Sequence, residues 1–139
     1  MRQATQTTTR IHVCVTCRAE GEAAEPLSAR AGARLHASLT ARAGEAYAIV
    51  PVECLSVCKK PCTVSFAAPG KWTYVYGGLL PDEAEHIILE GARLYEATCD
   101  GIIAWKQRPD ALKKGVVARV PPLPVTAAAP QPANAEAAP

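Results

Sequence analysis

The sequence predicts a mixed α/β domain built from a β-α-β unit, a β-hairpin and a second helix. Ile11, Val13 and Val15 alternate in the short run IHVCV, which is typical of a strand. Between residues 27 and 42, Leu and Ala recur at every fourth position, which is the period of an amphipathic helix. The apolar run 46–52 predicts a second strand. The two strands should lie parallel, joined by a right-handed crossover.

Breaker residues separate these elements. The segment RAEGEAAEP, residues 18–26, carries Gly21 and Pro26 and predicts a loop. Pro26 suits the first turn of the following helix, and Gly44 predicts its end.

Two further strand-like runs, CTVSFA and KWTYVYG, come next in the chain. Pro69 and Gly70 join them with the dihedral preferences of a tight turn, which predicts a β-hairpin. Trp72, Tyr74 and Tyr76 alternate, so the period of a strand places them on one face.

A second helix is predicted to open at Pro81, because the two acids that follow are favourable at the positive end of a helix. Its apolar stripe reaches Tyr95, and it should end near Cys99, with Gly101 as the stop. The segment GIIAWKQRPDALKKGVVARV predicts a short helical turn that covers the core with Trp105.

The order strand, helix, strand, hairpin and helix is the layout of a thioredoxin-like α/β sandwich. We expect this domain over residues 10–120. Residues 1–9 are polar and predict a flexible N-terminus. Residues 121–139 are rich in Pro and Ala and predict a disordered tail.

The amino-acid composition restricts the classes of function that we expect for this domain. Of its 139 residues, 49% are apolar, which suffices for a core without disulfides. A net charge of +2 gives no reason to expect nucleic-acid binding. The start MRQATQTTTR lacks the apolar region of a signal peptide, and no apolar run approaches the ~18 residues of a membrane span. We therefore expect a cytoplasmic protein with no membrane partner and with reduced cysteines.

Four cysteines stand at the ends of the two predicted parallel strands. Cys14 and Cys17 form a CxxC motif after the first strand, and Cys54 and Cys58 form a CxxxC motif after the second. If these strands are neighbours, both pairs emerge at the same edge of the sheet. We therefore expect the four thiolates to converge there.

Three chemistries compete for these thiolates. CxxC in a cytoplasmic α/β chain is the signature of a redox-active dithiol, but a loop separates Cys17 from the helix, and Cys54 and Cys58 stay unexplained. Four thiolates at tetrahedral reach suit Zn²⁺. They also suit a [2Fe–2S] cluster, which takes two thiolates per iron and gains from nearby cations and backbone N–H donors.

Residues around the cysteines suit an anionic cluster. Arg18, Lys59 and Lys60 lie within two residues of candidate ligands. Ser56 is small and would let the loop backbone approach the sulfides.

The stretch VECLSVCKKPCTVSF…YVYGGLLPDEAEHII resembles the cluster-binding half of thioredoxin-like [2Fe–2S] ferredoxins and is similar to the small iron–sulfur subunit of respiratory complex I. There a strand ends in Glu-Cys-Leu-Gly-x-Cys, before a hairpin and a helix that opens with Pro and an acid. The resemblance implies that Cys54 and Cys58 ligate one iron, and Cys14 and Cys17 the other. Ser56 replaces the family's glycine, and the first pair is more closely spaced than usual.

Over about residues 10–122, from CVTCR through APGKWTYVYG to GIIAWKQRPDALKKGVVARVPP, the chain also resembles a bacterial family of predicted metal-binding proteins. Members of that family are sometimes associated with cobalamin metabolism, so the resemblance allows a supporting role there.

We therefore expect a ferredoxin-like electron carrier and not an enzyme, since no catalytic arrangement is evident. Cys14, Cys17, Cys54 and Cys58 would bind the [2Fe–2S] cluster at a face that meets a redox partner protein. Related ferredoxins often dimerise, so a homodimer is allowed. The alternative is a metal-binding or metal-delivery protein that uses the same thiolates for Zn²⁺ or another soft divalent ion.

Three more side chains lie near these motifs or carry similar chemistry. Cys62 could substitute for a metal ligand, but we expect a bystander near the cluster. Cys99 is expected to be a small buried hydrophobe. His12 should share a strand face with Cys14 and be packed or hydrogen-bonded there.

Overall fold

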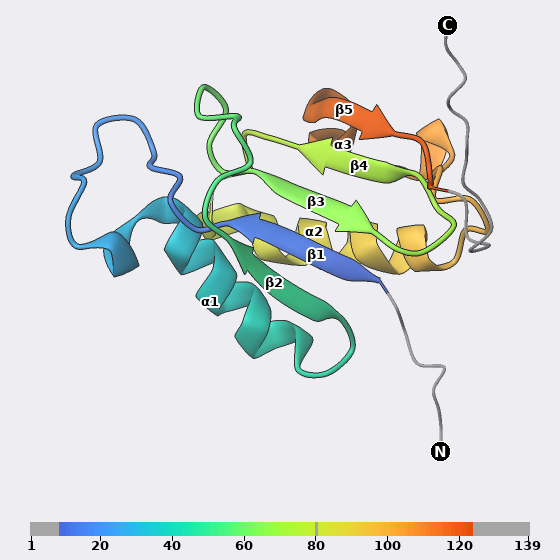
Figure 1. Cartoon of the computed structure of the whole chain (residues 1–139), viewed down its shortest axis with the longest axis horizontal. Helices are drawn as coiled ribbons and strands as arrows, with labels where there is room; N and C mark the ends of the chain where they lie inside the picture. Colours follow the sequence, from blue (N-terminus) through green and yellow to red (C-terminus); the bar gives the residue numbers. More distant parts are fainter. Residues whose placement is uncertain (1–8, 80, 124–139) are drawn as a thin grey trace, which may run out of the picture.

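Five strands form one sheet in the part of the chain that the computed structural model describes, residues 9–79 and 81–123 (Figure 1). The strand order in the sheet is β2-β1-β3-β4-β5. In chain order the strands are β1 (Arg10–Cys14), β2 (Ala48–Val52), β3 (Val64–Ala67), β4 (Thr73–Tyr76) and β5 (Val116–Val120).

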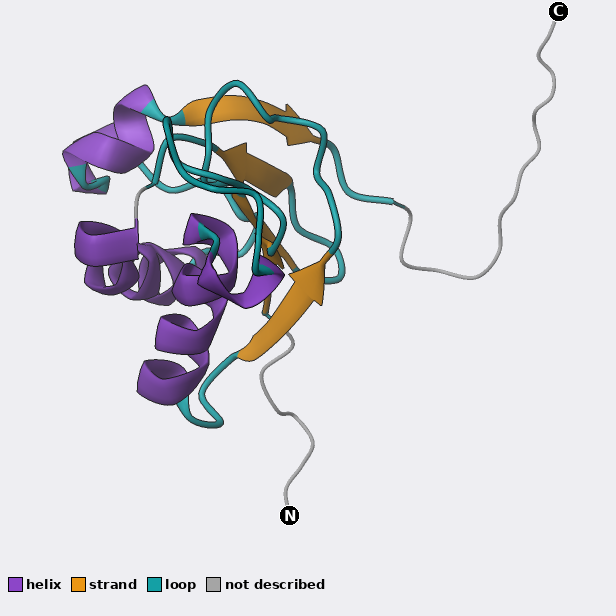
Figure 2. Ribbon diagram, turned by 90° about the vertical axis from the view of Figure 1, so that its left-hand side faces the viewer, coloured by secondary structure: helices purple, strands orange, loops and turns teal. Residues whose placement is uncertain are grey.

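The helices gather on one side of this sheet, so the described residues form two layers (Figure 2). They are α1 (Ala31–Ala43), α2 (Pro81–Glu96) and α3 (Asp110–Lys114), with short 3-10 turns at Leu27–Ala29 and Trp105–Gln107. The expected mixed α/β class is therefore confirmed.

The predicted parallel pairing of the first two strands is also confirmed. In the register of β1 and β2, Arg10 lies opposite Ala48, and Cys14 lies opposite Val52. Because α1 carries the chain back between them, both strands run in the same direction and end at the same edge of the sheet.

The β3–β4 hairpin adds to the other side of β1 in the antiparallel direction, as expected. At its turn, Gly70 has φ 75°, a value that glycine adopts without steric cost, and Lys71 N–H donates to the Ala68 carbonyl at 3.1 Å. Pro69 and Gly70 therefore occupy the central positions of a tight turn.

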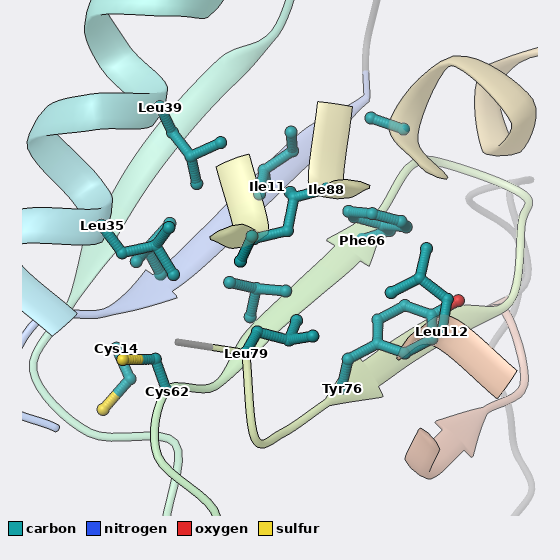
Figure 3. Close-up of a cluster of buried hydrophobic side chains, with 14 of the residues drawn as sticks. Ile11, Cys14, Leu35, Leu39, Cys62, Phe66, Tyr76, Leu79, Ile88 and Leu112 are labelled. Atoms are coloured by element: carbon teal, nitrogen blue, oxygen red, sulfur yellow. The ribbon is translucent and has the colours of Figure 1, made fainter. Parts of the chain in front are cut away.

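Apolar side chains from both layers form the core between the sheet and the helices (Figure 3). Ile11 of β1, Phe66 of β3, Leu35 of α1 and Ile88 of α2 are all 0% exposed. On the hairpin, Tyr74 and Tyr76 are buried and stack with ring centroids 5.9 Å apart, which fits the predicted one-faced alternation.

Both long helices have different ends from those expected. α1 begins at Ala31 and not at residue 27, because Arg30 has extended backbone dihedrals and serves as the N-cap. α2 ends at Glu96 and not near Cys99. There the ammonium of Lys71 donates to the carbonyls of Tyr95 and Glu96 at 3.2 and 3.0 Å, so a side chain from the hairpin helps to satisfy the last carbonyls of the helix.

The prediction for residues 101–120 was incomplete and in part wrong. The segment contains α3 and also β5, which pairs antiparallel with β4. Trp105 does not cover the core: it is 58% exposed, with the charged groups of Arg108 and Lys113 at 5.3 and 5.6 Å from its ring centroid. Leu112 of α3, which is 0% exposed, fills the core there.

The predicted flexible N-terminus and disordered tail fall mostly outside the described residues, since 1–8 and 124–139 are not described. Thr9 is buried, and its carbonyl accepts a hydrogen bond from Ala48 N–H at 3.3 Å. Within the described part, no helix combines the length and the apolarity that crossing a membrane requires.

Candidate functional site

Cys14 and Cys17 lie at the end of β1, packed against the first turn of α1. Both side chains are buried, with exposed fractions of 2% and 6%. The Gly32 N–H of α1 donates to the Cys17 carbonyl at 3.0 Å. A Cβ atom on Gly32 would lie only 2.1 Å from the Cys14 carbonyl oxygen, so this close approach requires glycine. The helix start therefore lies directly against the CxxC segment, although a loop separates the two in sequence.

Cys54 and Cys58 lie on the loop after β2, and both are exposed. Within this loop, Ser56 N–H donates to the Cys54 sulfur at 3.2 Å. Ser56 has φ 63°, in the left-handed region that favours glycine.

Several contacts join the two cysteine segments across the ends of β1 and β2. Val15 N–H donates to the Val52 carbonyl at 2.9 Å, which continues the parallel pairing one residue beyond Cys14. The Thr16 hydroxyl donates to the Glu53 carbonyl. The Cys14 sulfur lies 4.0 Å from the same carbonyl oxygen. The first cysteine pair is therefore attached to the residue that precedes Cys54.

A cavity of about 720 Å³ opens beside these contacts and is lined by three of the four predicted ligands, Cys14, Cys17 and Cys58. Arg18 and Arg30 contribute positive charge to its wall, and Glu20 and Glu22 contribute negative charge. Cys54 is not among the lining residues.

The described residues contain no preformed group of three or more Cys, His, Asp or Glu side chains placed to hold a metal ion. The structure thus brings Cys14 and Cys17 together and places Cys58 on the same cavity. It does not bring all four sulfurs to one point. All four are free thiols, so none of them is committed to a disulfide.

The environments of the two buried thiols differ in their effect on pKa. Burial alone would raise the pKa of Cys14, but hydrogen bonds to its sulfur from the Cys17 thiol and the Leu55 backbone N–H outweigh burial and lower it. Burial and the neighbouring Cys14 raise the pKa of Cys17 to about 11. The backbone of Leu55, a residue of the second cysteine segment, therefore favours the thiolate form of Cys14.

Cys62 is a third buried thiol at this edge of the sheet. It is 0% exposed and lies close to Cys14 in the core (Figure 3). Burial, with further contributions from the charges of Cys17 and Cys14, raises the pKa of Cys62 to about 12. Cys62 therefore lies near the other thiols, as expected. Its role as a substitute metal ligand stays a prediction.

Two other expectations have clear outcomes. Cys99 is exposed and not buried, because α2 ends before it. His12 is half-buried, and its Nδ1 lies 2.8 Å from the Ser65 hydroxyl across β1 and β3, so the expectation of a hydrogen-bonded histidine is confirmed.

Residues that sequence reasoning missed hold this site in place. Arg30 donates to the carbonyls of Thr16 and Ala24 at 3.0 and 2.8 Å. One Glu22 carboxylate oxygen accepts the backbone N–H groups of Ala19 and Ala31, both at 2.9 Å. Neither arginine nor glutamate marks such a role in sequence, whereas Thr16 stands inside the CVTC motif.

Glu22 provides a test of this arrangement by pH. Hydrogen bonds from the N–H groups of Ala19 and Ala31, then the charge of Arg34, lower the pKa of Glu22. Because the folded pKa lies below the unfolded value of about 4.3, the ionised carboxylate stabilises the fold above that value, and the contribution is lost as pH falls through the folded pKa. We expect Glu22→Gln to lower the melting temperature at neutral pH, with the difference disappearing towards about pH 3.

Thermal unfolding followed by circular dichroism across this pH range measures the difference. Glu20→Gln is the matched control, since Glu20 is an exposed acid of the same loop that makes no ion pair within the described residues. A deficit for Glu22→Gln that persists unchanged at low pH would assign the effect to packing and not to the carboxylate charge.

The fold and the site together define a mixed α/β protein in which two neighbouring parallel strands end in free cysteines. The chain belongs to the family described as "Protein of unknown function (DUF1636)", whose model matches residues 11–122. Comparison with curated proteins and with solved structures gave no match.

Proposed function

We propose that the protein is an electron carrier that binds a [2Fe–2S] cluster through Cys14, Cys17, Cys54 and Cys58. The observation that carries this proposal is the parallel pairing of β1 and β2, which places Cys14 opposite Val52, two residues before Cys54. Both cysteine pairs therefore begin at the same edge of the sheet.

The donor set suits such a cluster chemically. Thiolates are the protein ligands of [2Fe–2S] centres, and the four candidates are free. A backbone N–H group already donates to one of their sulfurs, from Ser56 to Cys54. Hydrogen bonds of this kind stabilise the negative charge of cluster sulfurs.

The two cysteine pairs differ in how firmly they are held. Cys14 and Cys17 are buried against α1, while Cys54 and Cys58 are exposed on a loop. The proposal therefore needs the loop to close over the buried pair, with the Thr16–Glu53 contact as the attachment point. A bound cluster would supply one-electron chemistry. Arg18 and Arg30 on the cavity wall would offset part of its negative charge, with Glu22 of the same wall paired to Arg34.

The visible absorption spectrum of anaerobically purified protein tests the proposal. We expect a red-brown chromophore with about two irons and two sulfides per chain, bleached when dithionite donates one electron per cluster. Cys54→Ser should abolish the chromophore, because one of the four ligands is lost. Cys99→Ser is the matched control: Cys99 is equally an exposed thiol, so its loss should leave the spectrum unchanged.

A chromophore that survives Cys54→Ser would refute this ligand set. Colourless protein that contains about one zinc per chain, released by Cys54→Ser, would instead favour the alternative, a metal-binding or metal-delivery protein for Zn²⁺ or another soft divalent ion. Metal analysis of the same samples separates these outcomes.

A further inference from the structure

A second hollow adjoins the cysteine cavity and is lined by cationic side chains from three segments of the chain. It has a volume of about 880 Å³ and shares Arg18 and Cys58 with the cysteine cavity. Lys59 and Lys60 reach it from the loop after Cys58, and Lys114 reaches it from the end of α3. We call this hollow, with Arg18, Lys59, Lys60 and Lys114, the lysine groove.

The lysine groove concentrates positive charge, which a single carboxylate in its lining offsets only in part. Its lining holds these four cations and one carboxylate, that of Glu20, a net charge of +3 in a chain whose total is +2. Lys59, Lys60 and Lys114 are exposed and form no ion pair within residues 9–79 and 81–123. Their charges are therefore available to a partner.

The floor of the groove is a set of backbone segments tied to one another. Gly77 N–H donates to the Gly115 carbonyl, and Gly78 N–H donates to the Lys60 carbonyl, both at 2.9 Å. A Cβ atom on Gly77 would lie 2.9 Å from the Cβ of Lys60, so glycine is required at this contact. These bonds hold the cysteine loop and the end of α3 together, although they lie far apart in sequence.

The same bonds argue against a built site for a small anion. Phosphate and carboxylate sites use free backbone N–H groups or the fork of an arginine. Here the N–H groups of Gly77, Gly78 and Gly115 already donate to carbonyls, and Arg18 donates to the Glu22 carbonyl at 3.3 Å. What remains is exposed ammonium groups on flexible stems, which suit an extended acidic surface better than one enclosed ion.

We propose that the lysine groove docks an acidic segment of a partner protein beside Cys58. The inference rests on the proposed function, because it names the chemistry of the partner that would exchange electrons with this site. Charge of one sign around a shallow hollow raises the rate of encounter with an oppositely charged protein and orients it. An acidic segment in the groove would lie next to the wall that carries the candidate ligand Cys58.

Fluorescein-labelled octaglutamate is a suitable probe, with binding followed by fluorescence anisotropy on the full chain at about 20 and 200 mM salt. Lys60→Glu/Lys114→Glu reverses one charge from each of two segments of the groove. Arg10→Glu/Lys106→Glu is the matched control, since it reverses two exposed charges elsewhere and changes net charge equally. We expect the groove variant to weaken binding about tenfold at low salt and the control to change it less than about twofold.

Other outcomes would overturn the inference. Equal weakening by both double variants would show a response to net charge alone. Competition by inorganic phosphate at low millimolar concentration would indicate a small-anion site. Tighter binding of octathymidylate than of octaglutamate would assign the groove to nucleic acid.

The absorption spectrum of each sample separates this inference from the proposed function. Colourless protein with groove-dependent octaglutamate binding would refute the cluster and retain the docking surface. Red-brown protein whose octaglutamate binding does not depend on Lys60 and Lys114 would retain the cluster and refute the docking surface.

Discussion

Gly32→Ala should destabilise the fold by about 3 kcal/mol and loosen the CxxC segment. Glycine to alanine inside a helix normally stabilises by about 0.5–1 kcal/mol, so the expected sign is opposite to helix propensity. The reason is the 2.1 Å between the position of the new Cβ and the Cys14 carbonyl oxygen. Backbone atoms must move apart, and the Gly32–Cys17 hydrogen bond lengthens with them.

Urea unfolding measures the change in free energy, and the rate of reaction with a thiol reagent reports the exposure of Cys14 and Cys17. Ala37→Gly is the control. Ala37 is an exposed residue of the same helix, so replacing it with glycine changes only the helix propensity. It should cost about 1 kcal/mol and leave thiol reactivity unchanged. A Gly32→Ala protein more stable than the wild type would mean that α1 does not lie against the CxxC segment.

Leu112→Ala should destabilise the protein by about 3 kcal/mol, the usual cost of a Leu to Ala cavity in a core. Leu112 is 0% exposed, and its Cδ1 lies 2.3 Å from where a Cβ on Gly91 would be, so α3 packs closely on α2. Hydrogen exchange should also accelerate in β5, the edge strand that directly follows α3.

Leu123→Ala is the comparison for this effect, because Leu123 is 83% exposed and should tolerate truncation without loss of stability. Urea unfolding of both variants, with hydrogen exchange of the β5 amides, gives the two readouts. Similar stabilities for the two variants would show that α3 does not complete the core.

The sequence predicted those elements whose apolar residues recur with a clear period or whose ends are marked by specific turn residues. The alternation of Ile11 and Val13 and the Pro69–Gly70 turn predicted β1 and the hairpin, which the structure confirms. β5 was missed because a strand at the edge of a sheet is mostly exposed and shows no alternation, and four of its five residues are exposed. Trp105 was misplaced since its size suggested burial, whereas two neighbouring cations stabilise it at the surface.

The candidate site also has features that the sequence could predict and features that it could not. Sequence spacing alone located the two cysteine pairs after two strands, and the register of Cys14 with Val52 places them at one edge. The unequal burial of the pairs was not predictable, because it depends on which segment α1 covers. Neither was the complete burial of Cys62, which the pairing of β1 with β3 brings into the core.

Sequence by itself determined the order of strands and helices from β1 to α2 and the positions of the cysteines along them, because these follow from short-range periods and turn residues. Only the tertiary structure decided that Glu22 bonds the start of α1, that Thr16 holds Glu53, and that Lys114 joins Lys59 and Lys60 in one groove. None of these contacts follows from a short-range period. The Thr16–Glu53 contact depends on the pairing of β1 with β2, and Lys114 lies beside Lys59 and Lys60 because Gly77 and Gly78 bond Gly115 and Lys60.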